Sequence, residues 1–457
     1  MKNILIILSA ATLLASCGIY TNYKRPSDVK TSNLYGNETT SQSDVDSTSL
    51  ASTPWREIFT DTKLQKLIES GLKNNTNLAT ARLNVEQAQA ALTQAKLSYL
   101  PSIALAPTGN VSSFDHSDAS WTYSAVAAAS WQIDAFGSIR NAKKQAIASK
   151  LQTEAYQQAV HSQVISSIAS VYYTLQMLDE QLRISEETQA IWKDNVRMIN
   201  AMKDAGMQTE ANVAQAEATY QSVIISVKSI QETINTTENA MCLLLAETPH
   251  HIDRASWSEE QFPENLYTGI PVQLLANRPD VRAAEFSLQK YFYGVNSARS
   301  AFYPSLTLSG QGGWTNSAGA MIINPGKVLL GAAASLTQPL FTKGANKAKL
   351  KIAKAQFESS KLNFQQTLLQ AGVDVNEALT KCQTARSKTV NVDKQIEALQ
   401  SAVNSTQALM DHGTTTFLQV LTARQSLLQA QVSKMTIWYD EAKGVIDLYQ
   451  ALGGGTK

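Results

Sequence analysis

The sequence predicts a mainly α-helical protein with a small β part, built from two copies of one structural unit. Three observations indicate this fold class. The 11 prolines leave two long gaps, between Pro107 and Pro249 and after Pro339, where long helices can run because proline breaks a helix interior. Short stretches alternate apolar and polar residues with the period of two that is typical of strands. A pattern of apolar residues also returns about 205 residues after its first occurrence.

Composition argues against several classes of protein. Among 457 residues, 39 lysines and arginines balance 38 aspartates and glutamates, and the net charge of +1 gives no electrostatic reason to expect nucleic acid as a partner. Apolar residues make up 44% of the chain, which permits a large core. We find no P-loop, GxSxG elbow or HExxH motif in the sequence, so we expect no enzyme and no catalytic residue.

The first residues read as a bacterial lipoprotein precursor. An apolar run from Ile4 to Ala15 has the length of a signal-peptide core and is too short to span a bilayer. It leads into Leu-Ala-Ser-Cys-Gly, which resembles the lipobox, so we expect residues 1–16 to be a lipoprotein signal peptide and Cys17 to carry a covalent acyl lipid. The alternative is an ordinary signal peptide with a chance cysteine. Gly18 follows in place of an aspartate, which favours the outer membrane.

Residues 17–54 form the expected lipidated tether, because positions 31–54 are rich in Ser, Thr, Asp and Asn. No later segment offers 18 consecutive apolar residues, so we expect no helical membrane span in the mature chain.

An internal duplication organises the remainder of the chain. We predict a first structural repeat over residues 55–255 and a second over residues 256–457. Each contains a heptad helix of about 24 residues (76–99 and 279–302), two strands and a long helical hairpin. Each heptad helix leads to a Pro-Ser pair. The apolar heptad positions of the two helices match one by one at an offset of 203 residues: Leu78, Val85, Leu92 and Tyr99 in the first copy, and Val281, Leu288, Val295 and Phe302 in the second. Later matches have slightly different offsets: 205 between Phe136 and Phe341, 208 between Tyr156 and Phe364, and 207 between Gly206 and Gly413.

Four segments are predicted to be strands. The clearest are 121–133 and 305–314, and weaker partners are 102–112 and 327–341. Their high Ala, Gly and Ser content would make a poor soluble core, which favours a membrane barrel with one row facing lipid and one facing water. An ordinary half-buried hairpin explains the same alternation. Four strands cannot close a membrane barrel, so two chains would give eight strands and three would give twelve; the pattern does not choose between them.

Two very long helices are expected, each followed by a returning helix. Residues 137–205 and 343–411 lead to a glycine, and residues 208–246 and 414–452 return. The first members could each span on the order of 100 Å at ~1.5 Å per residue. Their apolar rows are thin, and Gln, Ser and Thr cover much of the remaining surface. Such a surface suits a helix that lines water, and it equally suits a solvent-exposed coiled-coil rod.

The residues also resemble those of a known family. The run Leu-Leu-Ala-Asn-Arg-Pro-Asp-Val-Arg-Ala-Ala-Glu over 274–285 is very similar to a stretch of TolC-like outer-membrane factors. Tyr-Lys-Arg-Pro at 23–26, after Cys17, is similar to the start of the lipoprotein branch that serves resistance-nodulation-division (RND) efflux pumps. Gly206 and Gly413, the glycines between the long helices and the returning ones, resemble the tip glycines of the family, and the closing Ala-Leu-Gly-Gly-Gly also fits its pattern. The resemblance covers essentially the whole mature chain in order.

The resemblance implies a homotrimer in the cell outer membrane, lipid-anchored and with a periplasmic extension. Each chain would give four strands to a twelve-stranded β-barrel, continued by a long α-helical barrel through the periplasm. The partners would be a periplasmic adaptor protein, an inner-membrane RND-type pump and outer-membrane lipid. The duct would passively conduct small toxic compounds, drugs or metals, and perform no chemistry. The alternatives are a lipid-anchored periplasmic coiled-coil structural protein and the exit duct of a type I protein secretion system.

The family's gate pattern is altered in this chain. In many members acidic residues lie six and nine positions after each tip glycine. Here the four positions are neutral: Asn212, Gln215, Gln419 and Thr422. We therefore predict a polar periplasmic gate held by hydrogen bonds, with weak cation block. The expected adaptor contacts or gate locks at the helix tips are Asp204, Gly206, Glu210, Asp411, His412 and Gly413. The alternative is that these are ordinary solvated turn residues.

No metal site is expected. His250 and His251 follow Pro249 and are interpreted as a solvated loop pair. Cys242 lies in an apolar run and reads as a small buried hydrophobic residue, and Cys382 lies at a non-equivalent position on the other long helix. We expect both to be free thiols, with a disulfide left open.

Overall fold

The computed structural model describes residues 20–26, 50, 53–115, 117–260, 262, 274–315 and 327–456. The predicted acylation site Cys17 and most of the tether lie outside these residues. The chain divides into two compact units. The strand unit comprises Met1–Val29, Leu83–Ala155 and Ala283–Gln366, and the hairpin unit comprises Lys30–Arg82, Tyr156–Arg282 and Thr367–Lys457.

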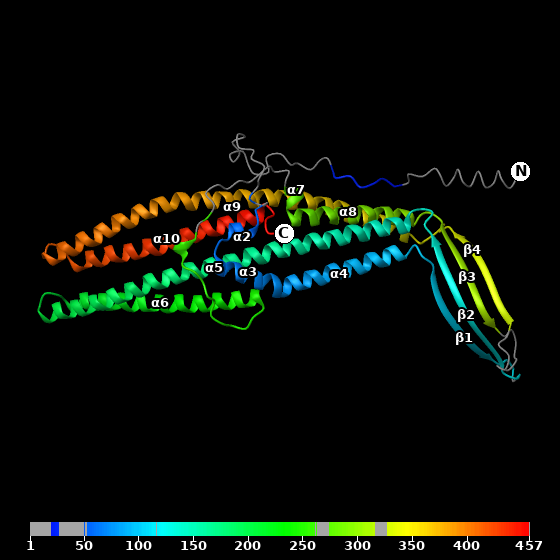
Figure 1. Ribbon diagram of the computed structural model, residues 1–457, viewed down its shortest axis with the longest axis horizontal. Coiled ribbons are helices and arrows are strands. Elements are labelled where there is room, and N and C mark those ends of the chain that lie inside the picture. The colour runs from blue at the N-terminus through cyan, green and yellow to red at the C-terminus, as the bar shows by residue number, and fades with distance from the viewer. Residues whose placement is uncertain are drawn as a thin grey trace. The chain divides into compact units, whose positions relative to one another are not determined.

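The predicted duplication appears in the element order (Figure 1). Each copy has a helix, two strands and a long helical hairpin. The first copy is α4 (Thr76–Leu97), β1 (Ser102–Ser112), β2 (Ser120–Ile133), α5 (Ser138–Asp204) and α6 (Glu210–Leu245); the second is α8 (Pro279–Ser300), β3 (Ser305–Thr315), β4 (Lys327–Thr337), α9 (Ala345–Asp411) and α10 (Phe417–Ala451). The short elements are α2 (Trp55–Ile58), α3 (Thr62–Asn74), the 3-10 turn η2 (Trp257–Glu259) and α7 (Leu274–Asn277).

The spacing of the two copies is more regular than the sequence pattern indicates. Helices α5 and α9 each contain 67 residues and begin 207 positions apart, and α6 and α10 keep the same offset. Strands β1 and β3 are offset by 203, so the four additional residues of the second copy lie in the connection between β3 and β4. The offsets of 205 for Phe136 and 208 for Tyr156 therefore miss the structural equivalence by one or two residues.

The strand unit contains one antiparallel sheet in the order β1-β2-β3-β4. Ser102 pairs with Ser130, Ser124 with Thr315, and Ser305 with Thr337, so the central pairing joins the two repeats. The backbones of β2 and β3 approach closely at Gly313, where an added Cβ would lie 2.1 Å from the carbonyl oxygen of Ala125. The pairing of β2 with β3 therefore requires a residue without a Cβ at this position, which is glycine.

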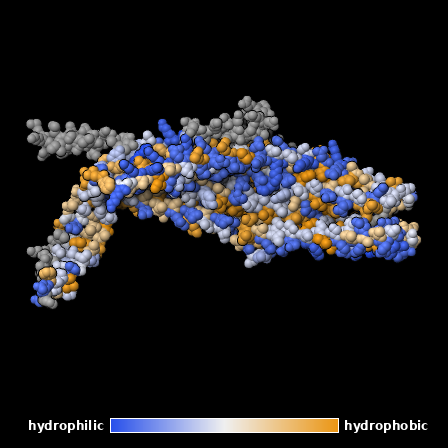
Figure 2. Space-filling model, turned by 180° about the vertical axis from the view of Figure 1, so that it is seen from behind, coloured by the Kyte–Doolittle hydropathy of each residue, from blue (hydrophilic) through white to orange (hydrophobic). Residues whose placement is uncertain are grey.

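The sheet buries little of its apolar surface within one chain. Every residue of β1 is exposed, including Ile103 at 77% and Leu105 at 75%. On the second copy, Leu330 is 81% exposed and Leu336 is 67% exposed. Figure 2 shows pale and hydrophobic residues over the sheet and hydrophilic residues on the helices that adjoin it. Apolar exposure on this scale marks a surface that contacts lipid or further protein.

The hairpin unit has a continuous core made by thin apolar rows of its long helices. Ile165 and Ile168 of α5 are fully buried, as are Ile446 and Leu448 of α10. Hydrogen bonds also link the two hairpins, including one from Gln450 Nε2 to Gln163 Oε1 at 2.6 Å. Small residues allow this close packing: at Gly444 an added Cβ would lie only 2.6 Å from Cys382 Sγ.

An aromatic cluster occupies the middle of the hairpin unit. Tyr173 of α5 is fully buried, and its ring centroid lies 6.5 Å from that of Phe59, 5.6 Å from Phe262 and 5.9 Å from Trp438. The segment that follows α6 packs against this cluster. No helix within the described ranges combines the length and apolar character needed to cross a membrane.

Candidate channel gate and helix tips

Both helix tips use the same glycine turn. Gly206 has φ +75° and Gly413 has φ +71°, a left-handed conformation that glycine adopts without strain. The amide of Met207 donates to the carbonyl of Met202 at 2.8 Å, and that of Thr414 donates to the carbonyl of Leu409 at 2.9 Å. These six-to-one bonds form Schellman motifs, which satisfy the last carbonyls of α5 and α9 and reverse the chain.

The returning helices begin with threonine caps. Thr209 accepts a hydrogen bond from the Asn212 amide through its side chain, whereas Thr416 makes no such side-chain bond. Three residues after Thr209, the Asn212 side chain donates to Gln208 Oε1 at 2.6 Å, and Thr415 donates to Gln419 Oε1. The neutral residues six positions after each glycine are therefore held by local hydrogen bonds.

All four predicted gate residues are exposed at the start of α6 and α10. Gln215 and Thr422 line one groove of about 440 Å³ between these helices, together with Trp192 of α5. Asn212 and Gln419 do not line this groove. The structure thus brings two of the four together within one chain.

The predicted tip contacts are divided between the two turns. Glu210 forms an ion pair with Lys203, at 3.1 Å between Oε2 and Nζ, and this pair links the two arms of the first hairpin. Asp204, Gly206, His412 and Gly413 are exposed. Asp411 is the last residue of α9, and its side chain lies outside the described part of the structure.

An apolar cluster joins the two hairpins behind the tips. Trp192 and Ile199 of α5 pack with Ala216 and Val223 of α6, and Leu421 of α10 completes the cluster. A polar pair lies on the same level of the second hairpin. Arg424 of α10 donates to Gln407 of α9 at 2.9 Å, its Nε has no partner among the described atoms, and burial lowers its pKa. Sequence inspection did not single out Arg424, because burial cannot be read from a lone arginine on a helix.

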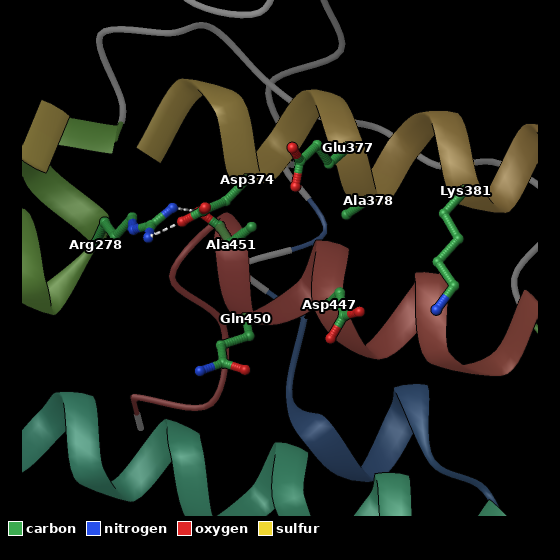
Figure 3. A pocket seen from close by; sticks show the side chains of 8 residues that line it. All are labelled: Arg278, Asp374, Glu377, Ala378, Lys381, Asp447, Gln450 and Ala451. Carbon is green, nitrogen blue, oxygen red and sulfur yellow. Dashed lines mark hydrogen bonds and ion pairs between the residues drawn. The ribbon is translucent and has the colours of Figure 1, made fainter. Parts of the chain in front are cut away.

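Arg278, in the run that carries the family resemblance, ties three segments of the hairpin unit together (Figure 3). Its guanidinium donates to Asp280 at 2.9 Å, to Asp374 of α9, and to the carbonyls of Ala371 and Ala451 at 3.2 Å each. Burial opposes its charge, but the hydrogen bonds to the two carboxylates outweigh this effect and raise its pKa. Figure 3 shows its side chain directed towards Asp374, with Asp447 and Gln450 on α10.

The three closing glycines complete the same region. At Gly453, with φ +90°, an added Cβ would lie 2.6 Å from the carbonyl oxygen of Asn277, and at Gly454 it would lie 2.3 Å from the Tyr449 ring. The carbonyls of Gly454 and Gly455 accept hydrogen bonds from Ser162 and His161 of α5 at 2.6 and 2.7 Å. These contacts require glycine and give the run a structural role.

The cysteines and histidines form local contacts. Cys242 and Cys382 are both buried free thiols, and burial raises the pKa of Cys382 to about 12. His250 lies 3.5 Å from Cys242 Sγ, and His251 lies 2.8 Å from Glu238, which also accepts from Arg254 at 2.6 Å. Within the described residues, no group of three or more His, Cys, Asp or Glu side chains could hold a metal ion.

Comparisons with known proteins match nearly the whole chain. A family model described as outer membrane efflux protein matches residues 67–247 and 270–454. The cation efflux system protein CusC of Escherichia coli is 27% identical over 404 residues, covering 88% of each chain. The probable outer membrane lipoprotein SilC of Salmonella typhimurium is 26% identical over 411 residues, again covering 88% of each chain.

A solved structure shows the same fold. The open state of the MtrE outer membrane channel of Neisseria gonorrhoeae superposes with a TM-score of 0.86 at 27% identity, over 96% of this chain and 99% of that chain. The predicted combination of four strands and long helical hairpins is therefore the architecture of a solved outer membrane channel.

Proposed function

The chain belongs to the outer membrane efflux protein family, and on this premise we propose that it is the outer-membrane channel of a tripartite efflux system. It passively conducts small toxic compounds from an inner-membrane pump and its periplasmic adaptor to the exterior. The observation that carries the proposal is the duplicated unit of strands and long hairpins, which superposes on a solved outer membrane channel over 96% of the chain. The transported compound is selected by the pump.

The sheet supports a homotrimer. Its outer strands, β1 and β4, are the edges of a four-stranded sheet whose apolar side chains are exposed. A membrane barrel needs about eight strands or more, so several chains must contribute. Three copies supply twelve strands and bring each β4 edge to the β1 edge of a neighbour. The same arrangement closes the long hairpins into a helical duct. A solid coiled-coil rod explains the helices but leaves the sheet without a role.

The four residues Asn212, Gln215, Gln419 and Thr422 form the proposed periplasmic gate. They are exposed and neutral, and local hydrogen bonds hold the two nearest the turns. A constriction without carboxylates binds multivalent cations weakly, since no paired negative charge compensates the lost hydration. The exposed tip residues, including Asp204, Glu210 and His412, are proposed to contact the adaptor.

Conductance in planar bilayers tests the gate. Wild-type channels should show weak block by hexamminecobalt added from the periplasmic side. Gln215→Glu combined with Thr422→Glu should lower the blocking concentration by about tenfold or more, because six carboxylates would then face one constriction in the trimer. Ser229→Glu adds one carboxylate per chain to α6, fourteen residues beyond Gln215, and serves as the control for position when compared with Gln215→Glu alone. Potent block of the wild type would contradict the polar gate.

The lipid anchor and the repeat boundaries belong to the same proposal. Residues 1–16 are removed, Cys17 is acylated, residues 17–54 form the tether, and residues 55–255 and 256–457 are the two repeats. The similar protein SilC bears the name of an outer membrane lipoprotein, which supports the anchor. Cys17→Ala should abolish metabolic labelling with palmitate, and persistent labelling of this variant would refute the assignment.

A further inference from the structure

Basic residues gather where the strands lead into the long helices. Arg140 and Lys144 of α5 lie three and seven positions after Gly137, and Lys347 and Lys351 of α9 lie three and seven positions after Gly344. Both repeats thus carry a basic pair on one face of the first two helical turns. Residues 343–361 contain six lysines and a single acidic residue, Glu358. We call Arg140, Lys144, Lys343, Lys347, Lys349, Lys351 and Lys354 the basic belt.

In the second repeat the fold gives these charges no acidic partner among the described residues. The start of a helix carries a positive partial charge, and α9 has no acidic residue in its first turn. At the start of α5, the Asp134 carboxylate accepts from the amides of Ile139 and Arg140 at 2.9 and 2.8 Å. Lys347, Lys349 and Lys351 are exposed and form no ion pair within the described residues. The lysines at the start of α9 therefore cost the isolated chain electrostatic energy, which indicates an anionic partner outside the chain.

The described N-terminal segment places the belt close to the lipid anchor. Tyr20 donates from its hydroxyl to the Phe136 carbonyl at 2.9 Å, and Lys144 donates to Asn22 at 3.0 Å. Tyr20 follows the proposed acylated Cys17 by three residues, which span at most about 10 Å. The first turns of α5 therefore lie within reach of the headgroups in which the acyl chains of Cys17 are embedded.

A cavity beside the belt has the donors of an anion site. It measures about 460 Å³ and lies between α8 and α9, lined by Arg299, Lys354 and Asn296 and walled by Phe292 and Phe357. Asn296 is only 1% exposed, and its side-chain Nδ2 has no hydrogen-bond partner among the described atoms. Two cations and a buried unpaired amide thus meet at an apolar wall. Glu358 is the only acidic residue among those that line the cavity.

We propose that this cavity binds the phosphate of an anionic phospholipid from the leaflet facing the periplasm, and that the basic belt holds neighbouring headgroups of that leaflet. The inference rests on the proposed outer-membrane location. The aromatic wall favours a lipid over free phosphate, because it matches the glycerol and first acyl carbons that accompany the headgroup. Each exposed basic side chain near an anionic surface adds attraction for such lipids.

Native mass spectrometry of the full-length oligomer measures the lipid directly. Protein equilibrated in mixed micelles with equal phosphatidylglycerol and phosphatidylcholine should retain phosphatidylglycerol preferentially. Arg299→Gln combined with Lys354→Gln should reduce this preference about 25-fold, at about fivefold for each removed charge. Lys354→Arg, with Arg299 intact, should have the wild-type preference for phosphatidylglycerol. Lys394→Gln removes the same charge from α9 forty residues further along and should leave retention unchanged.

Three results would overturn the inference. They are equal retention of the two lipids by the wild type, an effect of Lys394→Gln as large as that of the cavity variant, and displacement of the lipid by millimolar inorganic phosphate, which would indicate a free-anion site. Conductance of the same preparation separates this inference from the channel proposal. Conducting oligomers without selective lipid retention refute only the lipid site, whereas retained lipid on particles that never conduct refutes the channel.

Discussion

Glu260 shows how a single buried carboxyl couples this protein to pH. It lies on the segment after α6, beside the aromatic cluster around Tyr173, and its Oε1 has no partner among the described atoms. Burial, followed by the nearby charge of Asp61, raises its pKa to about 7. The nearby Tyr173 hydroxyl lowers the pKa of Glu260, but burial outweighs this effect, and no cation among the described residues compensates a charge on Glu260.

The pH dependence of stability follows from the direction of this shift. The pKa of Glu260 is higher in the folded chain than the ordinary value of 4.5, so its stabilising contribution is complete below pH 4.5 and is lost as the pH rises through 7. Glu260→Gln should therefore raise the melting temperature at pH 8. The expected gain in unfolding free energy is about 1–3 kcal/mol, after allowance for the partial exposure of the side chain, and the variant should have little effect at pH 4.5.

The neighbouring exposed residue provides the control for this prediction. Glu259→Gln should change the melting temperature equally at both pH values. A Glu260→Gln variant that is less stable than wild type at pH 8 would show that the carboxylate is stabilised by a partner.

Residues differ in how far their roles can be predicted. The turns at Gly206 and Gly413 were predictable, since a glycine between two long apolar patterns signals a left-handed turn. The roles of Glu260 and Arg424 were not, because both depend on burial by segments distant in sequence. The anchoring role of Arg278 was hidden for the same reason: its partners Asp374 and Ala451 are 96 and 173 residues away.

At the scale of elements, the packing of α9 on α10 depends on one small residue. Gly444 lies in the C-terminal part of α10 and is buried, and an added Cβ would meet Cys382 Sγ at 2.6 Å and Cys382 N at 3.1 Å. The short approach lets the two helices share a thin apolar row. This contact could not be predicted, because an isolated glycine within a helical pattern does not show what it faces.

Substitution of two helical glycines tests this packing. Gly444→Ala should lower the free energy of unfolding by about 1–3 kcal/mol, because the added methyl group would overlap the Cys382 thiol and press against the backbone behind it. Gly294→Ala is the matched control in α8, where the nearest atom to the added Cβ is Gln145 Nε2 at 3.6 Å, and it should stabilise by up to about 1 kcal/mol through helix propensity. Denaturant unfolding measures both. Equal effects of the two variants would contradict the close approach.

Element boundaries were predicted well where proline and glycine mark them. The expected helices at 137–205 and 343–411 correspond to Ser138–Asp204 and Ala345–Asp411. The strand predicted over 327–341 ends earlier, at Thr337. The ladder does not continue through Pro339, because proline has no amide hydrogen. The side-chain Nε2 of Gln338 donates to the Phe302 carbonyl at 3.1 Å.

At the scale of the whole molecule, the duplication lets each chain supply two similar units, each with two strands and a long helical hairpin. The two repeats pair through β2 and β3, and equivalent contacts recur in each copy: Trp131 donates to the Tyr99 carbonyl at 2.8 Å, and Gln338 donates to that of Phe302. The sequence alone predicted the repeat and four strands. It could not choose the number of chains, because strand patterning does not specify which edges meet.

Single-particle imaging of the protein extracted from membranes in mild detergent tests the channel most directly. A trimeric channel should appear as a threefold hollow particle in which twelve strands form one barrel and the helical hairpins enclose a continuous lumen, with each β4 beside the β1 of a neighbouring chain. Solid rods, or particles that remain monomeric and soluble without detergent, would contradict the channel. The chain would then be a lipid-anchored periplasmic coiled-coil protein with a structural role.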